Sequence, residues 1–181
     1  MKAAQAKEKE VIFVERILVI GCPGAGKSSF ARRLREITGL PLHYLDMIWH
    51  RPDRTTISRE EFDRRLEQIL QTDRWIIDGN YQRTMARRLE ECDTVFLLDI
   101  PVEICLEGAK ERIGRQREDL PWVENELDEE FRQWIEEFPA RDLPQIRSLL
   151  EQYAGRRRIV VFRSRQEMEQ YLGRLAREQK K

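Results

Sequence analysis

The sequence lacks the features that mark exported and membrane-bound chains. No run of about 18 apolar residues occurs, and its absence argues against a membrane-spanning helix. The first ten residues, MKAAQAKEKE, contain no apolar stretch of the kind found in signal peptides. The only cysteines are Cys22, Cys92 and Cys105, and their spacing fits neither a disulfide framework nor a zinc site. We therefore expect a cytoplasmic protein with free thiols and no membrane partner.

The formal net charge is zero, because the 33 basic and 33 acidic residues cancel. This balance argues mildly against DNA as a partner, since nucleic-acid binding usually needs an excess of positive charge. The length of 181 residues predicts one domain, 1–181, with a flexible polar N-terminus at 1–10. The sequence leaves open whether the chain is a monomer or a homodimer. Two histidines, His43 and His50, do not form a metal-binding pair.

Short apolar runs alternate with segments of helical periodicity along the chain. Ser58 and Glu61, for example, form a capping box that predicts the start of a helix. The alternation predicts a parallel sheet with helices on both faces. The residues 11–15 are either an extra edge strand or a lead-in. The expected strands are RILVI (16–20), LHYLD (42–46), WIIDG (75–79), TVFLLDIP (94–101) and RIVVF (158–162).

The sequence GCPGAGKSS (21–29) matches the phosphate-loop pattern G-x-x-x-x-G-K-[ST] between a strand and a helix. Its glycines let the backbone curl so that several N–H groups face phosphate oxygens, and the following helix directs its positive end there. We expect the loop to bind ATP or another nucleoside triphosphate, with Lys27 on the outer phosphates and the Ser28 hydroxyl on Mg²⁺. The expected binding residues are Gly21, Pro23, Gly24, Ala25, Gly26, Lys27, Ser28 and Ser29.

A phosphate loop alone does not name a reaction, and the N-K-x-D motif of GTPases is absent. The chain resembles the adenylate kinase-like nucleotide kinase group, and within it the bacterial DNA topology modulation proteins. The segments that carry the resemblance are GCPGAGKSSFARRL (21–34), TGLPLHYLDMIWH (38–50), WIIDGNYQRTMARRLEECDTVFLLDIP (75–101) and RRIVVFRSRQEMEQYL (157–172). The resemblance implies an α/β fold of the P-loop NTPase type, a three-layer sandwich with a five-stranded parallel sheet of order 2-3-1-4-5. It also implies an ATP- and Mg²⁺-dependent phosphotransferase.

Three polar residues lie at or just after the ends of expected strands, on the side where parallel sheets bind ligands. Asp46 can orient an acceptor hydroxyl or hold Mg²⁺ through water, and a helix cap is the simpler alternative. Adenylate kinases carry D-G-F-P-R where this chain has D-G-N-Y-Q-R. The resemblance therefore implies that Asp78 contacts magnesium waters and acceptor, with Asn80 beside it.

Several arginines are candidates for binding phosphate. Arg83 and Arg87 are four residues apart, so that they can share a helix face and grip an acceptor phosphate. Arg112 and Arg115 loosely match the lid arginines of nucleotide kinases, and Arg117 follows them. We expect a lid at about 112–130 that closes over the phosphates. An exposed, highly charged helix surface is the alternative for each of these arginines.

These residues predict a kinase for a nucleoside monophosphate or a similar small acceptor. A phosphate clamp formed by Arg83 and Arg87 favours a nucleotide acceptor, whereas a hydroxyl-orienting Asp46 favours a kinase of hydroxyl metabolites. The alternative is a nucleotide-binding regulatory protein that affects DNA topology without small-molecule kinase activity. A chaperone-like ATPase is a third hypothesis.

Overall fold

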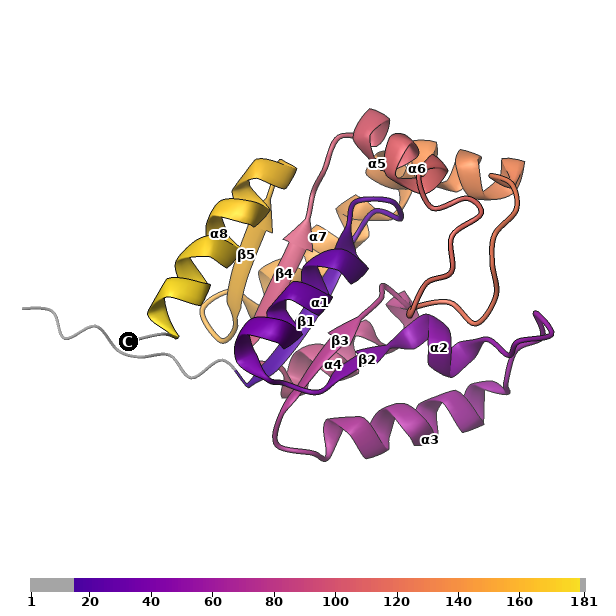
Figure 1. Ribbon diagram of the computed structural model, residues 1–181. Coiled ribbons are helices and arrows are strands. Elements are labelled where there is room, and N and C mark those ends of the chain that lie inside the picture. The colour runs from indigo at the N-terminus through magenta and orange to yellow at the C-terminus, as the bar shows by residue number, and fades with distance from the viewer. Residues whose placement is uncertain (1–14, 180–181) are drawn as a thin grey trace, which may run out of the picture.

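The computed structural model describes residues 15–179, in which strands and helices alternate (Figure 1). The expectations for 1–10, and for 11–15 apart from Glu15, lie outside the described residues. Within the described residues, no helix combines the length and the apolar character that crossing a membrane requires. The elements are β1 (Arg16–Gly21), α1 (Lys27–Thr38), β2 (Leu42–Tyr44), α2 (Leu45–Trp49), α3 (Arg59–Leu70), β3 (Trp75–Asp78), η1 (Gln82–Thr84), α4 (Met85–Glu91), β4 (Thr94–Leu98), α5 (Val102–Lys110), α6 (Glu129–Arg141), α7 (Leu143–Tyr153), β5 (Arg158–Phe162) and α8 (Arg165–Glu178).

The five strands form one parallel sheet in the order β2-β3-β1-β4-β5, which confirms the expected fold class. The apolar run of β1 is fully buried at the centre, where Leu18 is in register with Ile77 of β3 and Val95 of β4. A strand covered on both faces needs such an unbroken apolar run. The second strand is shorter than expected, because the chain becomes helical at Leu45 and places Asp46 in α2 rather than in β2.

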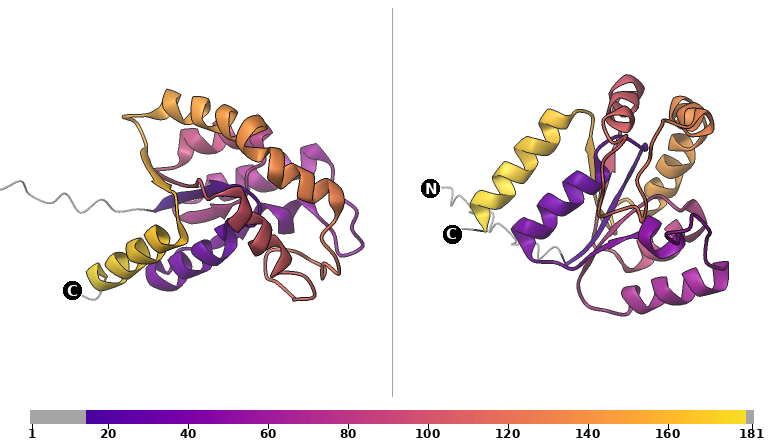
Figure 2. Two further views of the ribbon diagram at one scale, coloured as in Figure 1. Left: turned by 90° about the horizontal axis from the view of Figure 1, so that it is seen from above. Right: turned by 45° about the vertical axis from the view of Figure 1, so that its right-hand side comes forward.

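Helices cover both faces of the sheet and produce a three-layer sandwich. Helices α1 and α8 pack together on one face, and α4 and α7 lie on the other (Figure 2). Aromatic packing joins the first pair to the sheet. The ring of Phe30 in α1 lies 5.1 Å from that of Phe96 in β4 and 5.3 Å from that of Phe162 in β5, measured between centroids. This packing holds α1, and with it the loop that precedes α1, against the centre of the sheet.

Helix α5 crosses the loop between β1 and α1 at two glycines. A Cβ atom at Gly108 would lie 2.2 Å from the carbonyl oxygen of Gly24, and a Cβ atom at Gly24 would lie 2.0 Å from the carbonyl oxygen of Cys105. Both distances are shorter than any real contact, so the two backbones approach more closely than side chains allow.

Gly108→Ala should therefore lower the melting temperature and weaken the ATP binding that the sequence predicts, although alanine is the better helix former. Gly173→Ala in α8 is the matched control, because its Cβ atom would meet only Arg177 Nη1 at 3.6 Å. That variant should gain about 0.5–1 kcal/mol from helix propensity. Thermal denaturation with and without ATP measures both effects. Equal stabilisation by the two substitutions would contradict the close approach.

Candidate functional site

The loop between β1 and α1 curls back on itself. Gly24 and Gly26 have φ angles of 82° and 99°, and the Ala25 N–H donates to the Cys22 carbonyl at 3.1 Å. Lys27 begins α1, and its Nζ donates to the carbonyl oxygens of Gly21 and Cys22, both at 3.0 Å. The ammonium group is thus hydrogen-bonded to the backbone of the loop in which the sequence predicts that it binds phosphate. Gly21 ends β1 and lines neither cavity described below. Its carbonyl oxygen accepts from both Lys27 and Asn80, and its N–H donates to Asn80.

The Ser28 hydroxyl lies between two carboxylates. Its Oγ is 2.6 Å from Asp78 Oδ2 and 2.8 Å from Asp119 Oδ2. A hydroxyl carries one hydrogen, so that it can donate to only one of these oxygens at a time. Asp78 is 5% exposed, and its second oxygen, Oδ1, is buried without a hydrogen-bond partner among the described residues. This arrangement brings two acidic groups together with an oxygen still unsatisfied.

The two carboxyl groups differ in their pKa values. Burial raises the pKa of Asp78 to about 6, and the nearby charge of Lys27 only partly opposes this effect. Burial also raises the pKa of Asp119, but the hydrogen bond and the charge of Arg117 outweigh it and leave this pKa below its ordinary value. At neutral pH both groups are therefore ionised, and Asp78 bears the larger desolvation cost.

Asp78→Asn should make the nucleotide-free protein more stable at pH 7.5 by up to ~3 kcal/mol, the free energy that corresponds to a pKa raised from 3.8 to about 6. The folded state holds this proton more tightly than the unfolded state. Ionisation of Asp78 therefore costs the folded state no stability below about pH 4, and its full cost in stability applies above about pH 6. Denaturant titrations at pH 4 and 7.5 measure it.

Asp63→Asn is the control for this substitution, because an exposed ion pair with Arg83 lowers the pKa of Asp63. Its loss should be weakly destabilising at pH 7.5, opposite in sign to the effect at Asp78. A destabilised Asp78→Asn protein at pH 7.5 would contradict the burial argument.

Two cavities meet at the end of the phosphate loop. The first, of about 450 Å³, is lined by the loop, by Arg115 and by Arg165 of α8. The second, of about 640 Å³, is lined by Asp46, Asp78 and several aromatic side chains. The residues that line both are Lys27, Ser28, Arg112, Arg117 and Asp119. A phosphorylated ligand in the first cavity can thus present its outer phosphate to a ligand in the second.

The residues between α5 and α6 form neither a helix nor a strand, and Figure 1 shows them descending from α5 toward α2 and returning to α6. The Gly114 N–H donates to the Glu124 carbonyl at 2.7 Å and closes this segment into a loop. Arg117 pairs with Asp119 and with Glu124, both at 2.6 Å. This segment corresponds to the expected lid. It brings Asp119 to Ser28, and no sequence motif indicated that contact.

Arg112 lies in the turn after α5, and Arg115 lies just beyond that turn, so that neither belongs to the helix. Arg112 lines both cavities, and its guanidinium lies 5.8 Å from the ring centroid of Phe131. Burial lowers the pKa of Arg112, whose Nε has no hydrogen-bond partner among the described residues. Arg115 is exposed and lines only the first cavity. Arg112 is thus the arginine at the junction of the cavities.

Two further expected residues lie at the site, Asp46 in α2 and Asn80 just after β3. Asp46 accepts a hydrogen bond from the Tyr81 hydroxyl at 2.7 Å and lines the second cavity. Asn80 forms two hydrogen bonds with Gly21. Its Oδ1 accepts from the Gly21 N–H at 2.9 Å, and its Nδ2 donates to the Gly21 carbonyl oxygen at 2.8 Å. Behind them, the fully buried Arg88 donates to the carbonyl oxygens of Gly79, Asn80 and Tyr81. Sequence reasoning missed this buried anchor because it lies among exposed charges.

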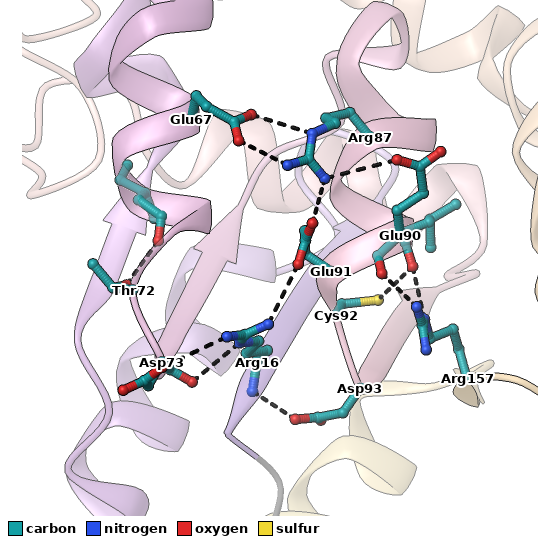
Figure 3. Close-up of polar contacts among 12 residues, drawn as sticks. Arg16, Glu67, Thr72, Asp73, Arg87, Glu90, Glu91, Cys92, Asp93 and Arg157 are labelled. Carbon is teal, nitrogen blue, oxygen red and sulfur yellow. Dashed lines mark hydrogen bonds and ion pairs between the residues drawn. The ribbon is translucent and has the colours of Figure 1, made fainter.

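The proposed arginine clamp is not at the site. Arg83 pairs with Asp63 at 2.6 Å, and Arg87 pairs with Glu67 at 2.7 Å, so that both arginines point to α3 and line neither cavity (Figure 3 shows Arg87). Arg83 lies in η1, outside the helix that contains Arg87. Two arginines four residues apart can pair with two carboxylates one turn apart on α3 as well as with a phosphate.

Comparisons with known proteins were made for the whole chain. No protein-family model matches it. It is 32% identical over 85 residues to the adenylate kinase of Thermotoga petrophila and 29% identical over 85 residues to that of Thermotoga neapolitana. Each match covers 46% of this chain and 38% of the relative, so that the chain spans less than two fifths of the length of these curated relatives.

Solved structures match over nearly the whole length. The shikimate kinase from Acinetobacter baumannii in complex with shikimate has a TM-score of 0.58 and 17% identity, covering 93% of this chain and 97% of that one. The shikimate kinase from Bacteroides thetaiotaomicron has a TM-score of 0.54 and 16% identity, covering 93% and 99%. The structural matches show the P-loop α/β fold, and the sequence matches show a similarity to adenylate kinases over 85 residues.

Proposed function

We propose that this protein transfers the terminal phosphoryl group of ATP to a hydroxyl group of a small acceptor, with Mg²⁺ as cofactor. The observation that carries the proposal is the meeting of two cavities at Lys27, Ser28 and Arg112, with Asp46 facing only the second cavity. Phosphoryl transfer depends mainly on the positioning of donor and acceptor and on positive charge around the transferred group. The proposed lid arginines are Arg112 and Arg115.

ATP binds in the first cavity in this proposal. The phosphate loop and the N-terminus of α1 surround the triphosphate with backbone N–H groups, as such loops do. Lys27 exchanges its present loop carbonyl partners for phosphate oxygens, because a charged oxygen is the stronger acceptor. Arg112 lines the same cavity, and its Nε, which lacks a partner among the described residues, can donate to a phosphate oxygen.

Ser28 and Asp78 would hold Mg²⁺. Both supply oxygen atoms, which Mg²⁺ prefers, and Asp78 Oδ1 is buried without a partner. A bound cation would also neutralise part of the negative charge of Asp78 and Asp119, whose carboxylates both lie within hydrogen-bonding distance of the Ser28 hydroxyl. The bound ion would neutralise charge on the terminal phosphates.

Asp46 acts on the acceptor side as the group that orients a hydroxyl. It lines only the second cavity, and the Tyr81 hydroxyl holds one of its oxygens. Arg83 and Arg87 would favour a monophosphate acceptor only if they bound its phosphate. Both instead pair with carboxylates of α3, so they give no support to a monophosphate acceptor. The absence of that clamp favours the hydroxyl acceptor among the alternatives that the sequence left open.

The test is ADP release with ATP and Mg²⁺ across a panel of nucleosides, nucleoside monophosphates and hydroxyl metabolites, with ³¹P NMR of the product. We expect acceptor-dependent ADP release from the wild-type protein and its loss in Lys27→Ala. Arg83→Ala and Arg87→Ala should retain wild-type rates. Slow ADP release that no acceptor changes would contradict the proposal and favour a regulatory or chaperone-like ATPase.

A further inference from the structure

Resting on the proposed function, we infer that the acceptor is an uncharged hydroxyl compound with a flat aromatic ring, of the nucleoside class rather than the nucleoside monophosphate class. Two independent properties of the second cavity lead to this inference. Its wall carries two indole rings that do not pack into the hydrophobic core. Among the described residues, the arginines and the lysine that line it are either paired with carboxylates or also line the first cavity.

The ring is inferred from Trp122 and Trp134. Both are half-buried and line the second cavity, yet neither belongs to the hydrophobic core or to the side chains packed against it. Trp49 and Tyr81, which line the same cavity, do pack against the core. Indole rings that a core does not use offer faces on which a flat ring can stack, and stacking of a base on an aromatic side chain tolerates any base.

Both indoles are held in place. The Nε1 of Trp134 donates to Asp142 Oδ2 at 3.1 Å, while Gln82 Nε2 donates to the other oxygen of the same carboxylate at 2.9 Å. Trp122 meets His50 edge to face, with ring centroids 5.0 Å apart, and the guanidinium of Arg54 lies over the Trp122 ring, 5.8 Å from its centroid. A stacking ligand therefore uses the other face of this indole. Rings that are already oriented lose little entropy when a ligand binds.

His50 adds a polar contact to the same wall. It lines the second cavity, and its Nδ1 is buried without a hydrogen-bond partner among residues 15–179. A buried polar atom of this kind costs stability unless something bonds to it. A heteroatom at the edge of a bound ring can supply that partner, which an apolar ring cannot do.

The absence of a phosphate is inferred from the charges. The carboxylates Asp46, Asp78 and Asp119 lie at or beside the junction of the two cavities. Arg117 is already paired with Asp119 and Glu124. Arg141, which also lines the second cavity, is paired with Glu137 and Asp142. The cations that remain at the junction, Lys27 and Arg112, also line the first cavity, where the triphosphate would engage them. An acceptor phosphate would therefore add charge beside carboxylates and the triphosphate, whereas a hydroxyl adds none.

The experiment measures binding separately from catalysis. The protein with ADP and Mg²⁺ is titrated in a calorimeter with adenosine, guanosine, cytidine and thymidine, with their 5′-monophosphates, and with ring-free polyols such as xylitol. At least one nucleoside should bind 10-fold or more tightly than its monophosphate and than any polyol. The same nucleoside should accelerate ADP release from ATP.

Single substitutions test the stacking. Trp122→Leu and Trp134→Leu should each raise the dissociation constant of that nucleoside about 10-fold and leave the KM for ATP unchanged. Trp75→Phe is the control, because Trp75 is buried in β3 and lines neither cavity. Circular dichroism confirms that each variant is folded before binding is compared.

The outcomes separate the two proposals. Tighter binding and faster transfer with a monophosphate or a polyol would overturn the nucleoside inference and leave the phosphotransferase intact. Nucleosides that bind as expected, with no compound on the panel raising ADP release, would support the ligand class and count against the phosphotransferase. If no nucleoside binds, or if the two tryptophan variants bind nucleosides as the wild type does, the inference is wrong.

Discussion

Lys27→Ala is expected to lower the rate constant for phosphoryl transfer about 1,000-fold, the effect of removing a preorganised charged donor from the transition state. Nζ lies within 3.0 Å of two loop carbonyl groups, so that it is already positioned before any ligand binds. Lys27 lines both cavities and can follow the phosphoryl group from donor to acceptor. The affinity for ATP should fall less than the rate, because backbone N–H groups also bind the triphosphate.

Single-turnover measurements at saturating ATP and acceptor give this rate constant directly. Lys110→Ala is the matched control, since Lys110 is exposed in the last turn of α5 and lines neither cavity. That variant should transfer at the wild-type rate. Equal rates for wild type and Lys27→Ala would show that the ammonium group plays no part in transfer.

Asp46→Asn is expected to lower the same rate constant at least about 100-fold, the lower range for loss of a group that accepts a proton in the transition state. The substitution keeps the size of the side chain and its hydrogen bond from Tyr81, and it removes the charge that can hold and deprotonate an acceptor hydroxyl. The KM for ATP should change little, because Asp46 lines only the second cavity.

The measurement is single-turnover transfer over a range of pH, together with the KM for ATP. Asp63→Asn is the control, an exposed aspartate that pairs with Arg83 and lines neither cavity. Full activity of Asp46→Asn would mean that Asp46 serves only to hold Tyr81 and α2 in place.

The proposed lid illustrates the limit of a motif search. The resemblance to nucleotide kinases predicts a lid at about 112–130 with Arg112 and Arg115 on the phosphates. The structure instead makes Arg117 and Asp119 the ionic contact at the phosphate loop, and Asp119 reaches Ser28 across 91 positions of sequence. No local sequence pattern predicts a contact between residues that lie so far apart in the sequence.

The reverse error occurred at Arg83 and Arg87. Their spacing was real, but spacing shows only which side chains can share a surface. The ligand on that surface turned out to be a pair of carboxylates on α3, 20 residues earlier in the chain. Two carboxylates one turn apart on α3 pair with Arg83 and Arg87 as well as a phosphate could.

The sequence by itself determined the features that depend on neighbouring residues. The fully buried β1 followed from an apolar run, the start of α3 from the Ser58 cap that accepts the Glu61 N–H, and the curled loop before Lys27 from its glycines. These features follow from local patterns because backbone conformation and hydrophobic periodicity are set within a few residues. The family resemblance supplied the strand order, which the structure confirmed.

Tertiary structure alone decided which side chains share a cavity. It placed Trp122 and Trp134 in one wall, brought Asp119 to Ser28, and paired Arg83 with α3 instead of with the site. Each result depends on the packing of elements that are far apart in sequence. Where polar residues have several partners of suitable charge, only that packing determines which partner lies within hydrogen-bonding distance.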